Sequence, residues 1–156
     1  MATPLRAGDP APDFSGTLTN GDKVSLKDYR GKKLVMYFYP MDDTPGCTKQ
    51  ACSLRDHNKE IAAKGAAILG VSTQDEGSHR KFTEKYKLNF PLLADTDGAV
   101  GRAYGTIGGP GILSKLKSAA GMADRVTFVI DEKGRIARVI DKPDVANHAE
   151  EVLALL

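Results

Sequence analysis

Residues 37–52 decide the fold of this chain, and they read Tyr37-Phe38-Tyr39-Pro40-Met41-Asp42-Asp43-Thr44-Pro45-Gly46-Cys47-Thr48-Lys49-Gln50-Ala51-Cys52. An apolar run over residues 34–39 predicts a buried strand, and two prolines and a glycine then force a turn before a helical pattern begins. Thr44 is a typical N-cap residue, and Pro45 suits the first helical position. Cys47 is therefore expected in the first turn of a helix that follows directly on a buried strand.

This position favours the thiolate form of Cys47. The first amide N–H groups of a helix have no partner within it, and the helix dipole is positive at that end. A free cysteine titrates near ~8.5, but its pKa can fall to roughly 3.5–7.5 in such a setting. Free cysteines are otherwise often small buried hydrophobes. The turn residues in front of Cys47 favour a nucleophile over that structural interpretation.

The composition excludes several classes of protein. The 156 residues suit a single domain, 1–156, and the contents of 41% hydrophobic and 27% charged residues are typical of soluble globular proteins. A net charge of +2 creates no strong field for nucleic acid or an anionic membrane. No stretch approaches the ~20 apolar residues of a membrane span, and the N-terminus lacks a signal peptide's apolar core. We therefore expect a cytoplasmic protein.

The cysteine count points to redox or nucleophilic chemistry. The chain has two cysteines, Cys47 and Cys52. In a reducing compartment such a pair is more often catalytic or redox-sensing than a permanent bridge. Neither a Cys-x-x-Cys pair nor the paired histidines of a zinc site are present. No metal and no cofactor are expected.

The remaining chain alternates strand and helix patterns around this stretch. Strands are expected at residues 34–39, 66–72, 90–95, 126–130 and 135–140, with an N-terminal hairpin around Asn20-Gly21. Helices are expected from Cys47 to about Gly65, with Cys47, Ala51, Leu54, Asn58 and Ile61 on one stripe, and at residues 76–87, 97–104 and 145–156; residues 105–121 read as a long loop.

This order predicts an α/β domain with a mixed central sheet and helices on both faces. The last two strands form a second hairpin, and residues 34–72 form a strand–helix–strand unit with a right-handed crossover. Ligands in such sheets gather at the carboxyl ends of strands. Cys47 is expected at one of those ends.

Several chemistries could use a thiolate here: proteolysis, acyl transfer, disulfide exchange or peroxide reduction. Cys–His hydrolases need an imidazole within hydrogen-bond reach of the sulfur. His57 lies ten residues along the same predicted helix, roughly 15 Å away, and His79 and His148 are expected on the surface. Peroxide reduction instead needs a hydroxyl, backbone amides and a permanent cation. Thr44 can supply the hydroxyl.

The spacing Pro40-x-x-x-Thr44-x-x-Cys47 resembles the signature of the peroxiredoxins, and the surrounding residues are similar to the bacterioferritin comigratory protein (PrxQ) subfamily. Further segments resemble the family in order: Gly8-Asp9-x-Ala11-Pro12-x-Phe14, Gly70-Val71-Ser72, Ser78-His79-x-Lys81-Phe82, Phe90-Pro91-Leu92-Leu93-x-Asp95 and Arg125-x-Thr127-Phe128-Val129-Ile130-Asp131. The resemblance implies a thioredoxin-like fold with an N-terminal hairpin extension. It also implies reduction of hydrogen peroxide and organic hydroperoxides, with recycling by a thioredoxin-type dithiol.

Carried over by position, the resemblance assigns roles to individual residues. Cys47 would be the peroxidatic cysteine, Thr44 would contact the peroxide, Pro40 would shield the thiolate and Arg125 would be the cation. From the residues alone, Arg125 reads as a solvated charge at a strand end.

Two further residues complete the expected pocket. Tyr39 reads as a core aromatic with a solvated hydroxyl and, secondarily, as a residue that shapes the pocket; Gly46 lies in the turn beside the thiolate. The chain departs from the family at Gln50, where Glu is common, and in having no Trp in residues 105–121.

With no third cysteine, Cys52 is the only candidate within the chain to resolve a Cys47 sulfenic acid. Residues five apart on a helix have α-carbons about 8.6 Å apart, whereas a disulfide needs ~4.4–6.8 Å. The helix must therefore unwind before a Cys47–Cys52 disulfide forms. Such chemistry needs no second subunit, and a monomer is expected. The alternatives are a non-enzymatic redox sensor or partner-binding protein that uses the same cysteine pair, and a holdase-like chaperone.

Overall fold

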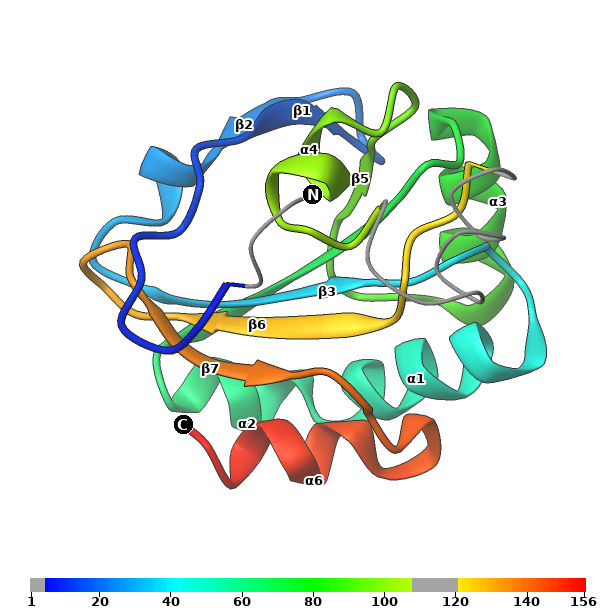
Figure 1. The fold of residues 1–156 in the computed structure, drawn as a ribbon. Coiled ribbons are helices and arrows are strands. Elements are labelled where there is room, and N and C mark those ends of the chain that lie inside the picture. The colour runs from blue at the N-terminus through cyan, green and yellow to red at the C-terminus, as the bar shows by residue number, and fades with distance from the viewer. Residues whose placement is uncertain (1–4, 108–120) are drawn as a thin grey trace.

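The computed structural model describes residues 5–107 and 121–156. Within them, seven strands form one mixed sheet in the order β2-β1-β5-β4-β3-β6-β7 (Figure 1). The strands are β1 (Ser15–Leu18), β2 (Lys23–Ser25), β3 (Lys33–Phe38), β4 (Ala66–Ser72), β5 (Leu92–Ala94), β6 (Val126–Ile130) and β7 (Ile136–Ile140). Strands β3, β4 and β5 are parallel, and the others pair antiparallel. The predicted mixed α/β sheet, with β1 and β2 as an N-terminal hairpin, is confirmed.

Helices cover both faces of the sheet. They are α1 (Pro45–Asp56), α2 (Asn58–Ala63), α3 (Glu76–Tyr86), α4 (Ala99–Ala103) and α6 (His148–Leu153), with short 3-10 helices η1 (Leu26–Tyr29) and η2 (Val145–Asn147). Helices α1, α2, α3 and α6 contribute to one buried cluster, and η1 and α4 to the other. Figure 1 shows α1 and α6 side by side below the sheet, where Ser53 Oγ accepts the N–H of Ala149 at 3.0 Å.

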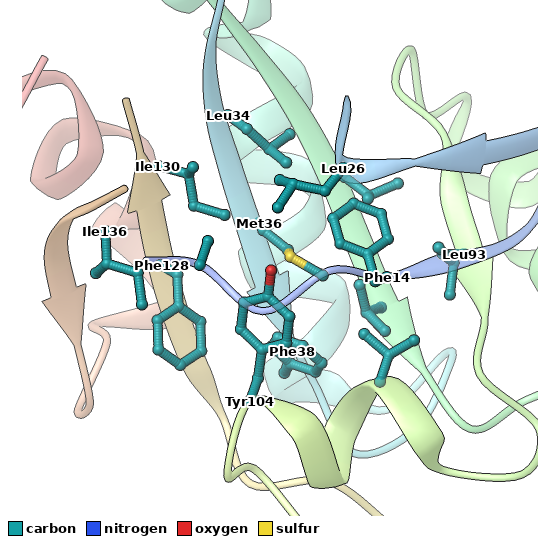
Figure 2. Close-up of a cluster of buried hydrophobic side chains, with 14 of the residues drawn as sticks. Phe14, Leu26, Leu34, Met36, Phe38, Leu93, Tyr104, Phe128, Ile130 and Ile136 are labelled. Atoms are coloured by element: carbon teal, nitrogen blue, oxygen red, sulfur yellow. The ribbon is translucent and has the colours of Figure 1, made fainter. Parts of the chain in front are cut away.

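Strand β3 is the centre of both clusters because successive side chains of a strand point to opposite faces. Met36 and Phe38 pack with Tyr104 and Phe128 in the cluster of Figure 2, where the Phe38 and Phe128 rings meet edge to face with centroids 5.9 Å apart. Tyr37, on the opposite face, joins Cys47 and α1 in the second cluster. Every residue from 34 to 39 is at most 1% exposed. The strand that leads into α1 is therefore fully enclosed.

The predicted helix from Cys47 to Gly65 is two helices. The break lies at His57, whose φ of −115° and ψ of 10° leave the helical region. Its Nδ1 lies 3.0 Å from the carbonyl oxygen of Ser53, one turn back. Four of the five predicted stripe residues are buried, and the fifth, Asn58, is partly exposed.

Two other element predictions need correction. Strand β5 covers only residues 92–94 and lies between β1 and β4. The C-terminal helix is the short 3-10 turn η2 followed by α6, which ends at Leu153. Most of the expected loop at 105–121 lies outside the described residues. Among the described residues, no helix is long and apolar enough to cross a membrane.

Candidate active site

Cys47 occupies the first turn of α1, as the sequence predicted. Thr44 is the N-cap residue in an extended conformation, Pro45 is the first helical residue, and the N–H of Thr48 bonds to the carbonyl oxygen of Thr44 at 2.8 Å. The Thr44 hydroxyl does not cap the helix; it donates to the carbonyl oxygen of Met41 at 3.3 Å. The Cys47 side chain is buried, with 1% exposure. Its sulfur thus lies at the positive end of a helix, in a largely apolar setting.

Arg125 lies beside this sulfur. Its Nη2 donates to Cys47 Sγ at 3.3 Å, and its Nη1 donates to Gln50 Oε1 at 2.7 Å. The antiparallel pairing of Phe38 with Val126 places the start of β6 next to the end of β3, where α1 follows. The sheet register therefore brings Arg125 to the cysteine. The solvated strand-end charge suggested by the residues alone is wrong, since the guanidinium is partly buried in the site.

Gly46 lets the guanidinium approach the helix. A Cβ atom at Gly46 would lie 3.2 Å from Arg125 Nη2, which is closer than ordinary van der Waals contact. The residue before the cysteine is therefore small for a steric reason that only the structure reveals.

Gln50 holds the other side of the guanidinium and was noted in the sequence only as a departure from a family pattern. It is fully buried, and because a guanidinium can only donate, the Gln50 amide oxygen must face Arg125. Its Nε2 has no hydrogen-bond partner among the described residues. The acceptor beside Arg125 is thus uncharged.

A second buried polar group, the Tyr37 hydroxyl, also has no hydrogen-bond partner among the described residues. Burial raises the pKa of Tyr37 well above its usual value, and the charges of Cys47 and Asp42 raise it further. Tyr37 therefore stays protonated beside the cysteine.

Tyr39 is buried as well. Its hydroxyl was expected to be solvated, but it is not. It donates to Asp42 Oδ1 at 2.6 Å. Asp42 Oδ2 accepts from Ser78 Oγ at 2.7 Å and lies 2.7 Å from His79 Nδ1. The expectation that His79 is a surface residue is wrong, because its side chain is completely buried. A signal was available: His79 stands three residues before the buried Phe82, on the inward stripe of α3.

Cys52 lies further along α1 and is partly exposed, and both cysteines are free thiols. The helix is continuous from Pro45 to Asp56, so the ideal separation of about 8.6 Å between the two α-carbons applies. Pro40, between β3 and α1, is partly exposed.

Comparison with known proteins decides the family. The sequence pattern of the AhpC/TSA family matches residues 7–139. The chain belongs to the AhpC/TSA family. It is 41% identical over 150 residues to peroxiredoxin Bcp of Escherichia coli, covering 96% of this chain and 94% of that one. It is 38% identical over 156 residues to peroxiredoxin Bcp of Bacillus subtilis, covering 97% and 95%.

Solved structures agree with this assignment. Peroxiredoxin Q of Xanthomonas campestris matches with a TM-score of 0.80 and 35% identity over 90% of this chain and 87% of that one. Peroxidoxin BcpB of Mycobacterium tuberculosis matches with a TM-score of 0.83 and 34% identity over 97% and 96%. The chain is therefore a peroxiredoxin of the Bcp/PrxQ group with a thioredoxin-like fold, and a thiol peroxidase.

The histidines of this peroxiredoxin form hydrogen bonds with groups other than the Cys47 sulfur. His148, expected on the surface, is buried, with Nε2 2.8 Å from Thr127 Oγ1 and Nδ1 3.0 Å from Glu151 Oε1. Within residues 5–107 and 121–156, no histidine nitrogen is hydrogen-bonded to Cys47 Sγ. The same residues contain no cluster of three or more metal-ligating side chains placed to hold a metal ion.

Proposed function

We propose that this peroxiredoxin reduces hydrogen peroxide and organic hydroperoxides with Cys47 as the attacking thiolate. The observation that carries the proposal is the 3.3 Å contact between Arg125 Nη2 and Cys47 Sγ at the start of α1. A permanent cation and a helix N-terminus both favour a thiolate over a thiol. A solved structure of the similar bacterioferritin comigratory protein of Xanthomonas campestris is described in terms of alkyl peroxide reduction activity, which supports the same substrate class.

In the first step, the Cys47 thiolate attacks the terminal oxygen of the hydroperoxide. A new S–O bond forms, the O–O bond breaks, Cys47 becomes a sulfenic acid and the departing alkoxide takes a proton to leave as an alcohol or water. Arg125 stabilises the negative charge as it moves from sulfur to the leaving oxygen. The Thr44 hydroxyl, three residues before Cys47, turns from the Met41 carbonyl to contact the peroxide. Pro40 and Tyr39 border the pocket.

In the second step, the Cys52 thiol condenses with the Cys47 sulfenic acid. The S–S bond forms and one water leaves, so that the two cysteines carry the oxidising equivalents of one peroxide. Since the intact α1 keeps the α-carbons too far apart for a disulfide, the first turns of the helix unwind during this step. A thioredoxin-type dithiol then reduces the disulfide by thiol exchange.

The proposal is tested by steady-state peroxide consumption with thioredoxin and thioredoxin reductase. Wild type should turn over many times per active site, and Cys47→Ser should be inactive because a serine hydroxyl does not ionise near neutral pH. Substantial turnover by Cys47→Ser would place the nucleophile elsewhere. Consumption of a single equivalent of peroxide, without turnover, would instead support the redox-sensor alternative.

We further propose that residues 1–156 form one domain that acts as a monomer in the cytoplasm. Both cysteines of the proposed disulfide lie on the same helix, so the reaction needs no residue from a second copy. Sedimentation of the reduced and the oxidised protein tests the monomer, and cell fractionation tests the location.

A further inference from the structure

A buried polar cluster lies beneath the turn that carries the site. Its members are Tyr39, Asp42, Ser78 and His79. Asp42 belongs to the turn between β3 and α1, whereas Ser78 and His79 belong to the first turns of α3. The cluster therefore ties the residues that precede Cys47 to a helix 36 positions further along the chain.

Asp42 makes the shortest hydrogen bonds of the cluster. Its Oδ1 accepts from the Tyr39 hydroxyl at 2.6 Å, and its Oδ2 accepts from Ser78 Oγ and faces His79 Nδ1, both at 2.7 Å. His79 Nε2 lies 3.1 Å from the carbonyl oxygen of Leu93 on β5. A carbonyl oxygen only accepts, so Nε2 carries the proton in this contact. Bonds to a charged acceptor are stronger than neutral ones.

The turn also holds a less common backbone conformation. Asp43, next to Asp42, has a φ of 59°, in the left-handed region that non-glycine residues rarely adopt. Its carboxylate reaches the surface, where it pairs with Lys85 Nζ at 2.7 Å and accepts from the Tyr86 hydroxyl at 2.7 Å. Exposed pairs of this kind contribute little to stability. Of the two contacts between the turn and α3, the buried one at Asp42 is therefore the stronger.

We propose that Asp42 is a positioning residue that holds the Pro40–Thr44 turn, and with it the first turn of α1, in the closed form. In the closed form α1 is helical from Pro45, and in the open form its first turns are unwound. Asp42 thereby sets the fraction of enzyme whose helix opens for condensation of Cys47 with Cys52. This inference rests on the proposed function, because it concerns the step between sulfenic acid and disulfide. In the closed form the helix dipole and Arg125 serve the attack on peroxide; in the open form the two sulfurs can meet. Asp42 favours the first form through buried bonds that the open form exchanges for water.

The test separates two rates in a single turnover of the full-length protein. Rapid acid quench and mass spectrometry follow the reduced, sulfenic and disulfide forms after one equivalent of hydrogen peroxide. Asp42→Ala removes the acceptor that Tyr39, Ser78 and His79 share, so condensation should be about tenfold faster. Oxidation of Cys47 should stay within about twofold of wild type, because most of the enzyme remains closed. Asp42→Asn keeps the shape and can donate to a neutral His79, so its condensation rate should lie between the two.

Asp43→Asn is the matched control for Asp42→Asn, since it replaces the neighbouring carboxylate of the same turn by an amide. Both of its rates should equal those of wild type. A folded Asp42→Ala protein with an unchanged condensation rate would overturn the inference, and so would an equal acceleration in Asp43→Asn. If Asp42→Ala does not fold, Ser78→Ala decides the question, because it removes one donor to Asp42. Condensation in Ser78→Ala should then be severalfold faster, and an unchanged rate overturns the inference.

A second measurement does not depend on the disulfide. In the reduced protein, hydrogen exchange of the amides of residues 47–50 should be faster in Asp42→Asn than in wild type, while the amides of α6 serve as an internal reference. Equal exchange at residues 47–50 in the two proteins counts against the positioning role of Asp42. If wild type forms no Cys47–Cys52 disulfide, the proposed function fails, and this exchange difference still tests Asp42 separately.

Discussion

The guanidinium of Arg125 lies 3.3 Å from the sulfur of Cys47, although the two residues are 78 positions apart in the sequence. The contact depends on β6 pairing with β3, so that the residue before β6 meets the helix that follows β3. A fixed positive charge is thus supplied to the first turn of α1 by the sheet and not by the helix itself.

Replacing Arg125 by Lys should leave the protein folded but reduce its second-order rate with peroxide roughly 100-fold. The guanidinium holds Cys47 and Gln50 with two different nitrogens, whereas an ammonium is a single point charge. Stopped-flow oxidation, together with a thiolate titration, measures the effect. If both match wild type, Arg125 has no role in the reaction.

Replacing Gln50 by Glu should reduce the fraction of Cys47 that is thiolate at neutral pH. The new carboxylate would compete for the charge of Arg125 from 2.7 Å and add a negative charge near the sulfur. The rate of alkylation by iodoacetamide as a function of pH reports this fraction, and its midpoint should move up by about one pH unit. Gln50→Met, which fills similar space without a charge, should not move the midpoint upward. An unshifted midpoint in Gln50→Glu would contradict the prediction.

Replacing Gly46 by Ala should slow the reaction with peroxide about tenfold without loss of stability. The added Cβ would lie only 3.2 Å from Arg125 Nη2 and would push the guanidinium away. Displacing a preorganised group reduces the rate. Alanine also favours the helix over glycine. Gly77→Ala is a matched control, because Gly77 is likewise the second residue of a helix and its added Cβ would meet Asp75 Oδ1 at an ordinary 3.5 Å. Equal rates for the two variants would show that Gly46 does not limit the position of Arg125.

Replacing Cys52 by Ser should stop the cycle at the Cys47 sulfenic acid. The first oxidation should keep its wild-type rate, while turnover with thioredoxin is lost because no thiol remains on α1 to condense with the sulfenic acid. Trapping with dimedone and mass spectrometry detects the intermediate. Normal turnover of Cys52→Ser with thioredoxin would exclude Cys52 as the resolving residue.

His148 should make the protein less stable in mild acid. Burial lowers its pKa below the usual value, and the nearby Glu151 opposes this shift without overcoming it. Between its folded pKa and the unfolded value near ~6.5, the unfolded state binds more protons, so stability falls as the pH drops through this window. Urea unfolding at pH 7.5 and 5.5 measures the slope, which should be smaller in His148→Gln.

His57 acts with the opposite sign. The carbonyl oxygen of Ser53 raises its pKa, so its contribution is present below about pH 6.5 and is lost as the pH rises. Because the His57 side chain is partly exposed, we expect this contribution to be small. Parallel pH curves for wild type and His148→Gln would show that His148 does not carry the acid sensitivity.

Local patterns predicted the elements around the cysteine well. The apolar run, the N-cap residue and the proline placed Cys47 correctly in the first turn of a helix after a buried strand. Strand β4 has the predicted bounds of residues 66–72. These features depend on neighbours within a few positions, and such neighbours are visible in one sequence. The family resemblance also indicated Arg125 as a site residue, whereas the local sequence around Arg125 suggested a solvated charge.

The buried histidines are harder to place from local patterns, although the spacing of His79 from Phe82 favours the inward face of α3. His79 is satisfied by Asp42, 37 positions away, and His148 by Thr127, 21 positions away. A histidine in a charged helix is expected on the surface unless its distant partners are known. Tyr39 is a different case, because its acceptor Asp42 is only three positions away and its hydroxyl reaches that acceptor through the fold of the turn at the end of β3.

The hydrogen bond between Ser53 and Ala149 limits how many residues of α1 can unwind. Ser53 Oγ accepts the Ala149 N–H at 3.0 Å, and the next residue, Leu54, is completely buried. Unwinding past Cys52 would break this bond and expose a leucine, at a cost of about 1.5–3 kcal/mol for the side chain alone. The oxidised enzyme would therefore display a six-residue disulfide ring, Cys47 to Cys52, on an otherwise unchanged body. A reductant would recognise a small local change of shape, and the sheet beneath would act as a rigid platform in both redox states.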